Sequence, residues 1–129
     1  RRDRNLLHRF PNETAHRKAR EAALDDVRKD VQASEARLAT LASERKPLVA
    51  ETEFYVGKKL PAALKQQLDA NDAATDAQKA LVQNQQSEIG RINALYDAEL
   101  ARLRQLWAGA TPGSPASLAS QSTPKPARQ

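Results

Sequence analysis

Cysteine and methionine are absent from this 129-residue chain, and glycine and aromatic residues are scarce, with four Gly, one Trp, two Tyr and two Phe. Without cysteine the chain can form no disulfide, no thiolate nucleophile and no cysteine-based zinc site. It also has no apolar run long enough to cross a bilayer and no hydrophobic signal sequence. Since the chain begins with Arg1 and Arg2 rather than Met, we expect a fragment or a processed form.

Ala, Leu, Gln and charged residues are abundant, and this composition favours long helices over sheets. The formal net charge is +5. Basic side chains gather near the start of the chain, where only Asp3 and Glu13 oppose Arg1, Arg2, Arg4, Arg9, Arg17, Lys18 and Arg20. We therefore predict an all-α fold with a thin apolar core and a basic N-terminal segment.

The strongest signal for a break between two helices is the stretch Phe54-Tyr55-Val56-Gly57-Lys58-Lys59-Leu60-Pro61. Gly57 can take the left-handed conformation that ends a helix, and Pro61 suits the first position of the next one. So short a connection makes the second helix return along the first. We predict a long antiparallel two-helix hairpin over residues 12–108, coiled-coil-like, with its tip at about residues 56–60.

The first helix is expected to begin after Asn12, whose side chain can accept from the free amides of the first turn. Further along, residues spaced alternately three and four apart follow a heptad pattern, which is typical of a helix that packs along one narrow stripe. These residues are Leu24, Val27, Val31, Ser34, Leu38, Leu41, Arg45, Leu48, Thr52 and Tyr55. Upstream of Leu24 the same spacing falls on Phe10, Glu13, Arg17 and Arg20. The stripe that packs between the helices, here called the seam, is therefore expected to become polar there.

Pro47 lies inside this pattern, where it removes one helical hydrogen bond and crowds the preceding turn. Because the heptad phase holds on both sides of it, the pattern favours a kinked but continuous helix. The alternative is a separate short helix from Leu48 to Tyr55.

The second helix is predicted from Pro61 to Ala108, with Gly109 as its stop. The antiparallel register places Leu41 beside Thr75 and Arg17 beside Glu99. Several stripe positions are polar and would need hydrogen-bond partners when buried. The stripe comprises Leu64, Leu68, Asn71, Thr75, Gln78, Val82, Gln85, Ile89, Ile92, Tyr96, Glu99, Leu103 and Leu106.

Both ends of the chain differ from the helical part. Residues 1–11 are predicted to form a basic irregular arm, whose apolar side chains, Phe10 among them, pack on Trp107 near the open end of the hairpin. Residues 109–129 are rich in Pro, Ser and Ala with almost no large apolar residue, so they are predicted to be disordered.

Residues that could carry chemistry are few. His8 and His16 lack the spacing of a metal pair and are expected to be surface residues. Asp69, Asp72 and Asp76 recur on one helix face but lack the looped backbone of a calcium site, so a solvated ridge is expected. No phosphate-binding loop, nucleophile elbow or triad is visible. The sequence predicts a protein that is not an enzyme and has no metal site and no cofactor.

Two segments could bind a partner. The tip, with Phe54, Tyr55, Val56, Gly57, Lys58, Lys59, Leu60 and Pro61, could be a docking point, or it could be a solvated turn with aromatics packed beneath it. The basic arm, with Arg1, Arg2, Arg4 and Arg9, could attract nucleic acid or an anionic membrane surface. The absence of a nucleic-acid recognition motif argues against nucleic acid.

Four stretches carry a resemblance to a known group. They are Leu6-Leu7-His8-Arg9-Phe10-Pro11-Asn12-Glu13, the tip stretch from Phe54 to Pro61, Ile92-Asn93-Ala94-Leu95-Tyr96-Asp97 and Leu103-Arg104-Gln105-Leu106-Trp107. Together they resemble the C-terminal helical region of uncharacterised proteobacterial envelope proteins, in which a signal peptide and a small β-rich domain precede the helices. The resemblance implies a periplasmic or cell-envelope location and brings no activity with it.

The sequence thus predicts a structural or protein-interaction hairpin, acting as a spacer or docking rod of a bacterial envelope protein. The seam is thin and polar, so an unidentified protein partner or self-association is expected to cover part of it. Binding of an anionic ligand by the basic arm is the alternative, with a membrane surface as a weak candidate. A third hypothesis is that the chain is an accessory subunit of an enzyme whose active site lies elsewhere.

Overall fold

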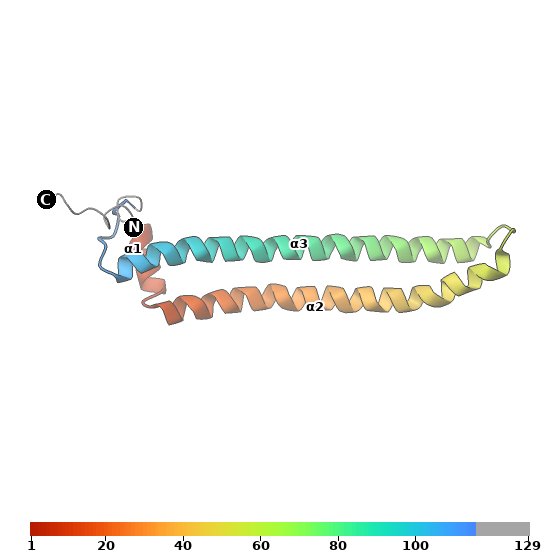
Figure 1. The fold of residues 1–129 in the computed structure, drawn as a ribbon, viewed down its shortest axis with the longest axis horizontal. Coiled ribbons are helices and arrows are strands. Elements are labelled where there is room, and N and C mark those ends of the chain that lie inside the picture. Colours follow the sequence, from red (N-terminus) through yellow and green to blue (C-terminus); the bar gives the residue numbers. More distant parts are fainter. Residues whose placement is uncertain (116–129) are drawn as a thin grey trace, which may run out of the picture. The chain divides into compact units, whose positions relative to one another are not determined.

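The computed structural model describes residues 1–115, and within them it contains helices and no strand. The elements are α1 (Arg2–Arg9), α2 (Glu13–Thr52), the short 3-10 helix η1 (Glu53–Tyr55) and α3 (Ala62–Trp107), as Figure 1 shows. The two long helices, α2 and α3, pack against each other. The prediction of an all-α fold is confirmed.

The chain divides into two compact units. The three-helix unit contains residues 1–25 and the segment from Gly90 onward, so it holds α1 and the adjoining parts of α2 and α3. The two-helix unit contains residues 26–89, with the remainder of α2 and α3 and the connection between them. Each unit has its own buried side chains and its own hydrogen bonds.

Side-chain and backbone caps fix where the long helices begin and end. Asn12 Oδ1 accepts from the Ala15 amide at 2.9 Å, which confirms the predicted N-cap of α2. At the end of α3, the Gly109 amide donates to Leu106 O and the Ala110 amide donates to Gln105 O. With a φ of 108° at Gly109, these two bonds form the Schellman motif expected of a glycine stop.

In the two-helix unit, the predicted stripes are the faces that the helices bury. From residue 26 to Tyr55, every stripe residue is buried or half-buried and every other residue is exposed. On α3 the eight stripe positions from Leu64 to Ile89 are also buried or half-buried, and residues 74 and 88 join them. The heptad spacing therefore predicted correctly which side chains are buried.

Hydrogen bonds across the two-helix unit show its register. The Asn71 amide group donates to Leu41 O at 2.9 Å, and the Gln85 amide group donates to Ser34 Oγ at 3.2 Å. As the residue number on α3 increases from 71 to 85, the number of its partner on α2 decreases from 41 to 34. The two segments therefore run in opposite directions in this unit. The predicted register, which placed Leu41 beside Thr75, lies between these two bonds. Asn71 is one helical turn before Thr75, whereas Gln85 is about one turn beyond the position that this register places beside Ser34.

The connection between α2 and α3 is a tight turn. α2 ends at Thr52, and η1 carries the chain to Tyr55. The Lys58 amide then donates to Tyr55 O at 2.7 Å, while Val56 has φ −58° and ψ 126° and Gly57 has φ 77°. These angles define a type II β-turn, which requires a residue with positive φ at its third position. Gly57 takes the predicted left-handed conformation, but within a β-turn rather than as a helix C-cap.

Pro47 lies within α2 without ending it, so the prediction of a continuous helix is confirmed and the alternative of a separate helix from Leu48 is wrong. Continuity is feasible because the cost of one lost backbone bond, about 3 kcal/mol, is offset by packing of the stripe on both sides of the proline.

The three-helix unit is built around Leu6, Phe10 and Leu103, with Trp107 packed against them. Trp107 Nε1 also donates to Phe10 O at 3.1 Å. The expected contact between Phe10 and Trp107 is therefore confirmed. The expected irregular arm is wrong, because residues 2–9 form α1. Eight residues are too few to be helical alone, so packing of Leu6 and Phe10 holds this helix in place.

Two further expectations are wrong in this unit. Glu13 and Arg17, assigned to the buried stripe, are exposed, and His16, expected at the surface, is only 1% exposed. The reason is that α2 here faces both α1 and α3 and buries a broader face than a two-helix seam requires.

The segment after α3 is ordered as far as the structure describes it. Gly109 to residue 115 form two turns, and the Ser114 amide donates to Thr111 O at 3.0 Å. The prediction of disorder from residue 109 is therefore wrong for residues 109–115. The remainder of the predicted disordered tail, residues 116–129, lies outside the described residues.

Candidate functional site

The tip residues are brought together by the turn, and two of them are strongly exposed. Phe54 is 79% exposed and Val56 is 80% exposed, and Lys58 and Lys59 follow them at the surface. Tyr55 is half-buried. The alternative in which both aromatic residues pack beneath the turn is therefore wrong for Phe54. An apolar pair beside two ammonium groups can contact a partner without prior rearrangement of the backbone.

The remaining tip residues shape the backbone rather than the surface. Gly57 supplies the positive φ, and a Cβ at this position would meet nothing within 4 Å. Leu60 and Pro61 are half-buried where the chain enters α3, and the Lys65 amide donates to Pro61 O at 3.0 Å. Proline has no amide hydrogen of its own, so the start of the helix has one unpaired donor fewer.

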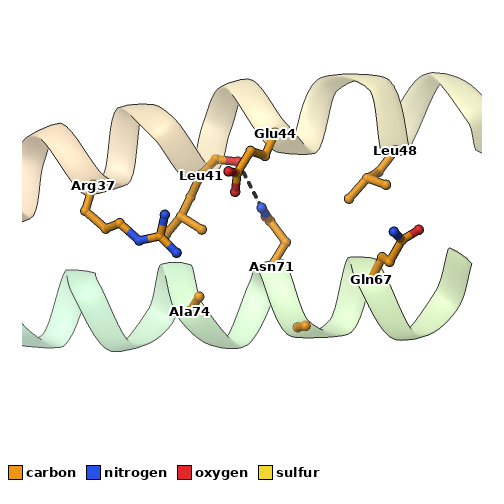
Figure 2. A pocket seen from close by; sticks show the side chains of 8 residues that line it. Arg37, Leu41, Glu44, Leu48, Gln67, Asn71 and Ala74 are labelled. Atoms are coloured by element: carbon orange, nitrogen blue, oxygen red, sulfur yellow. Dashed lines mark hydrogen bonds between the residues drawn. The ribbon is translucent and has the colours of Figure 1, made fainter. Parts of the chain in front are cut away.

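A groove of about 530 Å³ lies between α2 and α3 in the two-helix unit. Figure 2 shows Asn71 at its centre, with its amide group pointing to the Leu41 carbonyl of the facing helix. Arg37 and Glu44 extend from α2 and Gln67 from α3 along its sides. Asn71 Oδ1 is buried and has no hydrogen-bond partner among the described residues. A polar residue therefore interrupts the apolar seam here.

Charged residues near this groove pair at the surface. Arg45 Nη1 bonds to Asp72 Oδ1, and Lys65 Nζ lies 2.8 Å from Asp69 Oδ2. The Asp69 carboxylate raises the pKa of Lys65 above its ordinary value through this hydrogen bond. Both pairs are open to solvent, so water and salt screen them and they contribute little to stability. The acidic ridge of α3 is a solvated, ion-paired surface, as predicted.

Asp3 and Arg102 form an ion pair between α1 and α3 that the sequence did not reveal. Arg102 Nη2 lies 2.6 Å from Asp3 Oδ2, and both side chains are largely buried. The Gly113 amide also donates to Asp3 Oδ2, and Arg102 donates to Ser114 O. Hydrogen bonds from Arg102 and from the Gly113 amide lower the pKa of Asp3 to about 2. This pair ties the first helix and the segment after α3 to one another.

His16 and Arg20 connect α2 to α3 in the same unit. His16 Nε2 lies 3.3 Å from Glu99 Oε1, and its ring makes a T-shaped contact with Phe10 and a tilted contact with Tyr96. Arg20 donates to Asn93 Oδ1 at 2.9 Å and to Asp97 at 2.8 Å. Glu99 was expected beside Arg17; the nearer partner is His16, because α2 presents His16 rather than Arg17 to the interior.

The basic arm residues lie on or beside α1. Arg1, Arg2, Arg4 and Arg9 are all exposed. The Arg9 guanidinium lies over the Phe10 ring, 4.7 Å from its centroid. Within residues 1–115 none of these four guanidinium groups pairs with a carboxylate, which leaves their positive charge available to a ligand.

Sites for metals and membrane spans were also sought in residues 1–115. No cluster of three or more His, Asp or Glu side chains in this part of the chain could hold a metal ion. No helix in the same part combines the length and the apolar character needed to cross a bilayer. The tip, the groove at Asn71 and the basic face of α1 are the candidate binding surfaces.

Comparison with known proteins adds no further constraint. The chain matches no family model, no curated protein sequence and no solved structure.

Proposed function

We propose that this chain is a structural and protein-interaction module: a coiled-coil-like antiparallel helical hairpin that serves as a spacer or docking rod of a bacterial envelope protein. The envelope location follows from the resemblance of four stretches to helical regions of envelope proteins. A 40-residue helix such as α2 rises about 60 Å, a useful span for a spacer.

The exposed tip supports this proposal most directly. Phe54 and Val56 are large apolar side chains with about four-fifths of their surface in water, on a turn whose conformation Gly57 fixes. Burial of such side chains stabilises a complex by roughly 1.5 to 3 kcal/mol each. A pre-organised turn also loses little backbone entropy on binding. We propose the tip as the docking point for a protein partner.

The thin core supports a partner or self-association. In the two-helix unit the buried apolar residues are Val31, Leu41 and Leu64, and the polar Ser34 and Asn71 are buried as well. So few buried side chains give little hydrophobic stabilisation to a unit of this length. A second copy or another protein that covers the stripe would add the missing burial.

Cysteine pairs test the hairpin, because the natural chain contains no cysteine. Ser34→Cys/Gln85→Cys in the two-helix unit and Glu13→Cys/Arg104→Cys in the three-helix unit join residues that contact each other. A short bismaleimide should cross-link both pairs within one chain, and Ser34→Cys/Gln66→Cys should stay unlinked. Cross-linking of the out-of-register pair would contradict the hairpin, whereas dimers linked by the matched pairs would indicate exchange of helices between copies.

Photo-cross-linking in cells of the native host tests the docking point. A photoreactive phenylalanine analogue at position 56 should yield a covalent adduct of defined mass, and Phe54→Ser should abolish that adduct. The same analogue at the exposed position 66 is the matched control. Identical adducts from both positions, or none from position 56, would rule out docking through the tip.

A second candidate function is the binding of an anionic ligand by the basic arm. It is favoured by the four exposed guanidinium groups that lack a carboxylate partner among the described residues. Because Leu6 and Phe10 are buried, deleting the arm would disturb the core, and neutral substitutions such as Arg→Gln are the appropriate test. Loss of salt-dependent binding to anionic vesicles in the variant with all four substitutions, Arg1, Arg2, Arg4 and Arg9 to Gln, is the expected result.

A further inference from the structure

A second groove, of about 730 Å³, lies between α1 and α3 in the three-helix unit. Its volume is within the range of small-molecule sites. The α1 side is lined by Arg2, Asp3, Asn5, Leu6 and Arg9, and the α3 side by Leu95, Ala98, Glu99 and Arg102. The groove therefore has two guanidinium groups, Arg2 and Arg9, on its α1 side, and an apolar strip of Leu95 and Ala98 on its α3 side.

The charges around this groove are unbalanced toward the positive. Five charged residues line it, three arginines and two carboxylates, so their formal charges leave an excess of one positive charge. Asp3 bonds to Arg102, and Glu99 lies 3.3 Å from His16 Nε2. Arg2 and Arg9 have no carboxylate partner among the described residues. An anion entering the groove would meet two guanidinium groups whose charge is not neutralised, and charge-assisted bonds to guanidinium are among the stronger hydrogen bonds in proteins.

Arg2 and Arg9 stand on one face of α1. They are seven residues apart, so two turns of helix separate them by about 10 Å along the axis. Asn5 lies between them on the same face and offers an amide donor and acceptor. This face can hold an anionic headgroup with additional polar atoms.

The opposite side offers apolar surface that water now contacts. Leu95 is 50% exposed, and Ala98 one turn further along α3 is also exposed. An alkyl chain laid over them would gain about 25 cal/mol for each Å² removed from water. Leu95 lies outside the stripe that α3 packs against α2, so helix pairing does not account for a large apolar side chain at this position.

We infer that the groove between α1 and α3 binds an amphiphilic anion, a phosphate ester that carries an alkyl chain, with Arg2 and Arg9 at the phosphate and Leu95 and Ala98 under the chain. The inference deepens the second candidate function, since it assigns the anion to two particular arginines of the basic arm. The ligand could be a free amphiphile or the headgroup region of a lipid surface, and the same phosphate-and-alkyl chemistry serves both.

Titration of the whole chain with dodecyl phosphate below its micelle concentration tests the inference. Trp107, the chain's one tryptophan, packs against the cluster of Leu6, Phe10 and Leu103, and its fluorescence is expected to report binding. Calorimetry gives an independent dissociation constant. Arg2→Gln/Arg9→Gln should weaken binding at least tenfold. Arg1→Gln/Arg4→Gln, which removes the same charge outside the groove, should weaken it less than twofold. Arg2→Gln alone keeps Arg9 over Phe10 and should still weaken binding severalfold.

The apolar half has its own controls. Leu95→Ser should weaken binding of dodecyl phosphate severalfold, whereas Leu81→Ser, a change at a similarly exposed leucine of the two-helix unit, should not. Inorganic phosphate should bind at least tenfold more weakly than dodecyl phosphate. Vesicles containing anionic phospholipid form a second arm: binding to vesicles but not to free dodecyl phosphate, with the same dependence on Arg2 and Arg9, would identify a lipid surface as the source.

Three outcomes would overturn the inference. Equal losses of affinity in the two double-arginine variants would show that binding depends on general charge attraction and not on the groove. The second candidate function would then still hold. Equal affinity for inorganic and dodecyl phosphate would show that the alkyl chain gains nothing from Leu95 and Ala98. Binding to neither dodecyl phosphate nor vesicles would overturn the inference and the second candidate function together. Unchanged far-ultraviolet circular dichroism in each variant shows that the fold is intact.

Discussion

Asp3 and Arg102, 99 residues apart in the sequence, face each other through two hydrogen bonds, from Nε to Oδ1 at 3.1 Å and from Nη2 to Oδ2 at 2.6 Å. Such a forked pair fixes orientation as well as distance. The Asp3 carboxylate also accepts from the Gly113 amide, so one side chain joins α1, α3 and the segment that follows α3. No local pattern in the sequence indicates this contact.

The Asp3 pair predicts a loss of stability in acid. The folded pKa of about 2 lies below the ordinary value of 3.8, so between these values the unfolded chain binds more protons than the folded one. The contribution of the pair to the free energy of unfolding is therefore present above about pH 4 and is lost as the pH falls toward 2. Urea unfolding followed by Trp107 fluorescence at pH 7, 4 and 2 measures it.

Asp3→Asn isolates the effect of that carboxyl. Arg104 lowers the pKa of Glu13 as well, so acid also lowers the stability of both the natural chain and the variant through Glu13. The variant should be less stable than the natural chain at pH 7, and the difference should shrink as the pH approaches 2. A difference that stays constant over this range would show that the charge of Asp3 contributes nothing.

Asn71→Leu should stabilise the two-helix unit. The substitution removes a buried amide oxygen without a partner among the described residues and places an apolar side chain in the stripe opposite Leu41. The Leu41 carbonyl keeps its bond within α2, so the loss of the cross-helix bond costs only about 1 kcal/mol and the added burial should exceed it. Urea unfolding followed by circular dichroism should show a gain of roughly 1 kcal/mol.

Asn84→Leu is the matched control, because Asn84 lies on the same helix and is exposed. Its unfolding free energy should stay within about 0.5 kcal/mol of the natural value. Destabilisation by Asn71→Leu would mean that the polar contact at this position stabilises the unit more than burial of a leucine does.

Gly57→Ala should destabilise the connection between α2 and α3. The φ of 77° is a conformation that costs a residue with a Cβ about 1 kcal/mol, and since nothing lies within 4 Å of the added carbon the cost is in the backbone alone. Gly90→Ala is the opposite case, since Gly90 lies inside α3 with equally open surroundings. It should stabilise the helix by about 1 kcal/mol. Thermal unfolding of both variants should shift in opposite directions; two shifts of the same sign would disprove the turn geometry.

Sequence reasoning worked best where one interaction is repeated along the chain. The stripe from Val27 to Tyr55 was predicted residue by residue, because heptad spacing fixes the buried face of a helix whatever its partner. The caps at Asn12 and Gly109 were also predicted, since each depends on one residue type beside the helix end.

The three-helix unit was predicted less well because its contacts join distant segments. α1 has too few residues to carry a periodic signal, and it is helical because Leu6 and Phe10 pack on Leu103. Arg102 lies off the stripe of α3, so nothing in the spacing pairs it with Asp3. The two cross-helix bonds of the two-helix unit depart from the predicted register by about one turn in opposite directions, because the side chains of Asn71 and Gln85 reach along the facing helix.

The chain's two phenylalanines provide a last prediction, since one is 3% exposed and the other 79%. Phe10→Ala removes a ring that packs in the core of the three-helix unit, edge to face with His16 at 4.9 Å between centroids. Loss of a buried phenylalanine costs about 3 to 5 kcal/mol, so the unfolding free energy should fall by that amount and the Trp107 emission should shift to the red. Phe54→Ala should change the unfolding free energy by less than about 0.5 kcal/mol, because its ring is in solvent. If Phe54→Ala were the more destabilising of the two, the tip would be a packed turn, and docking through it would have to be abandoned.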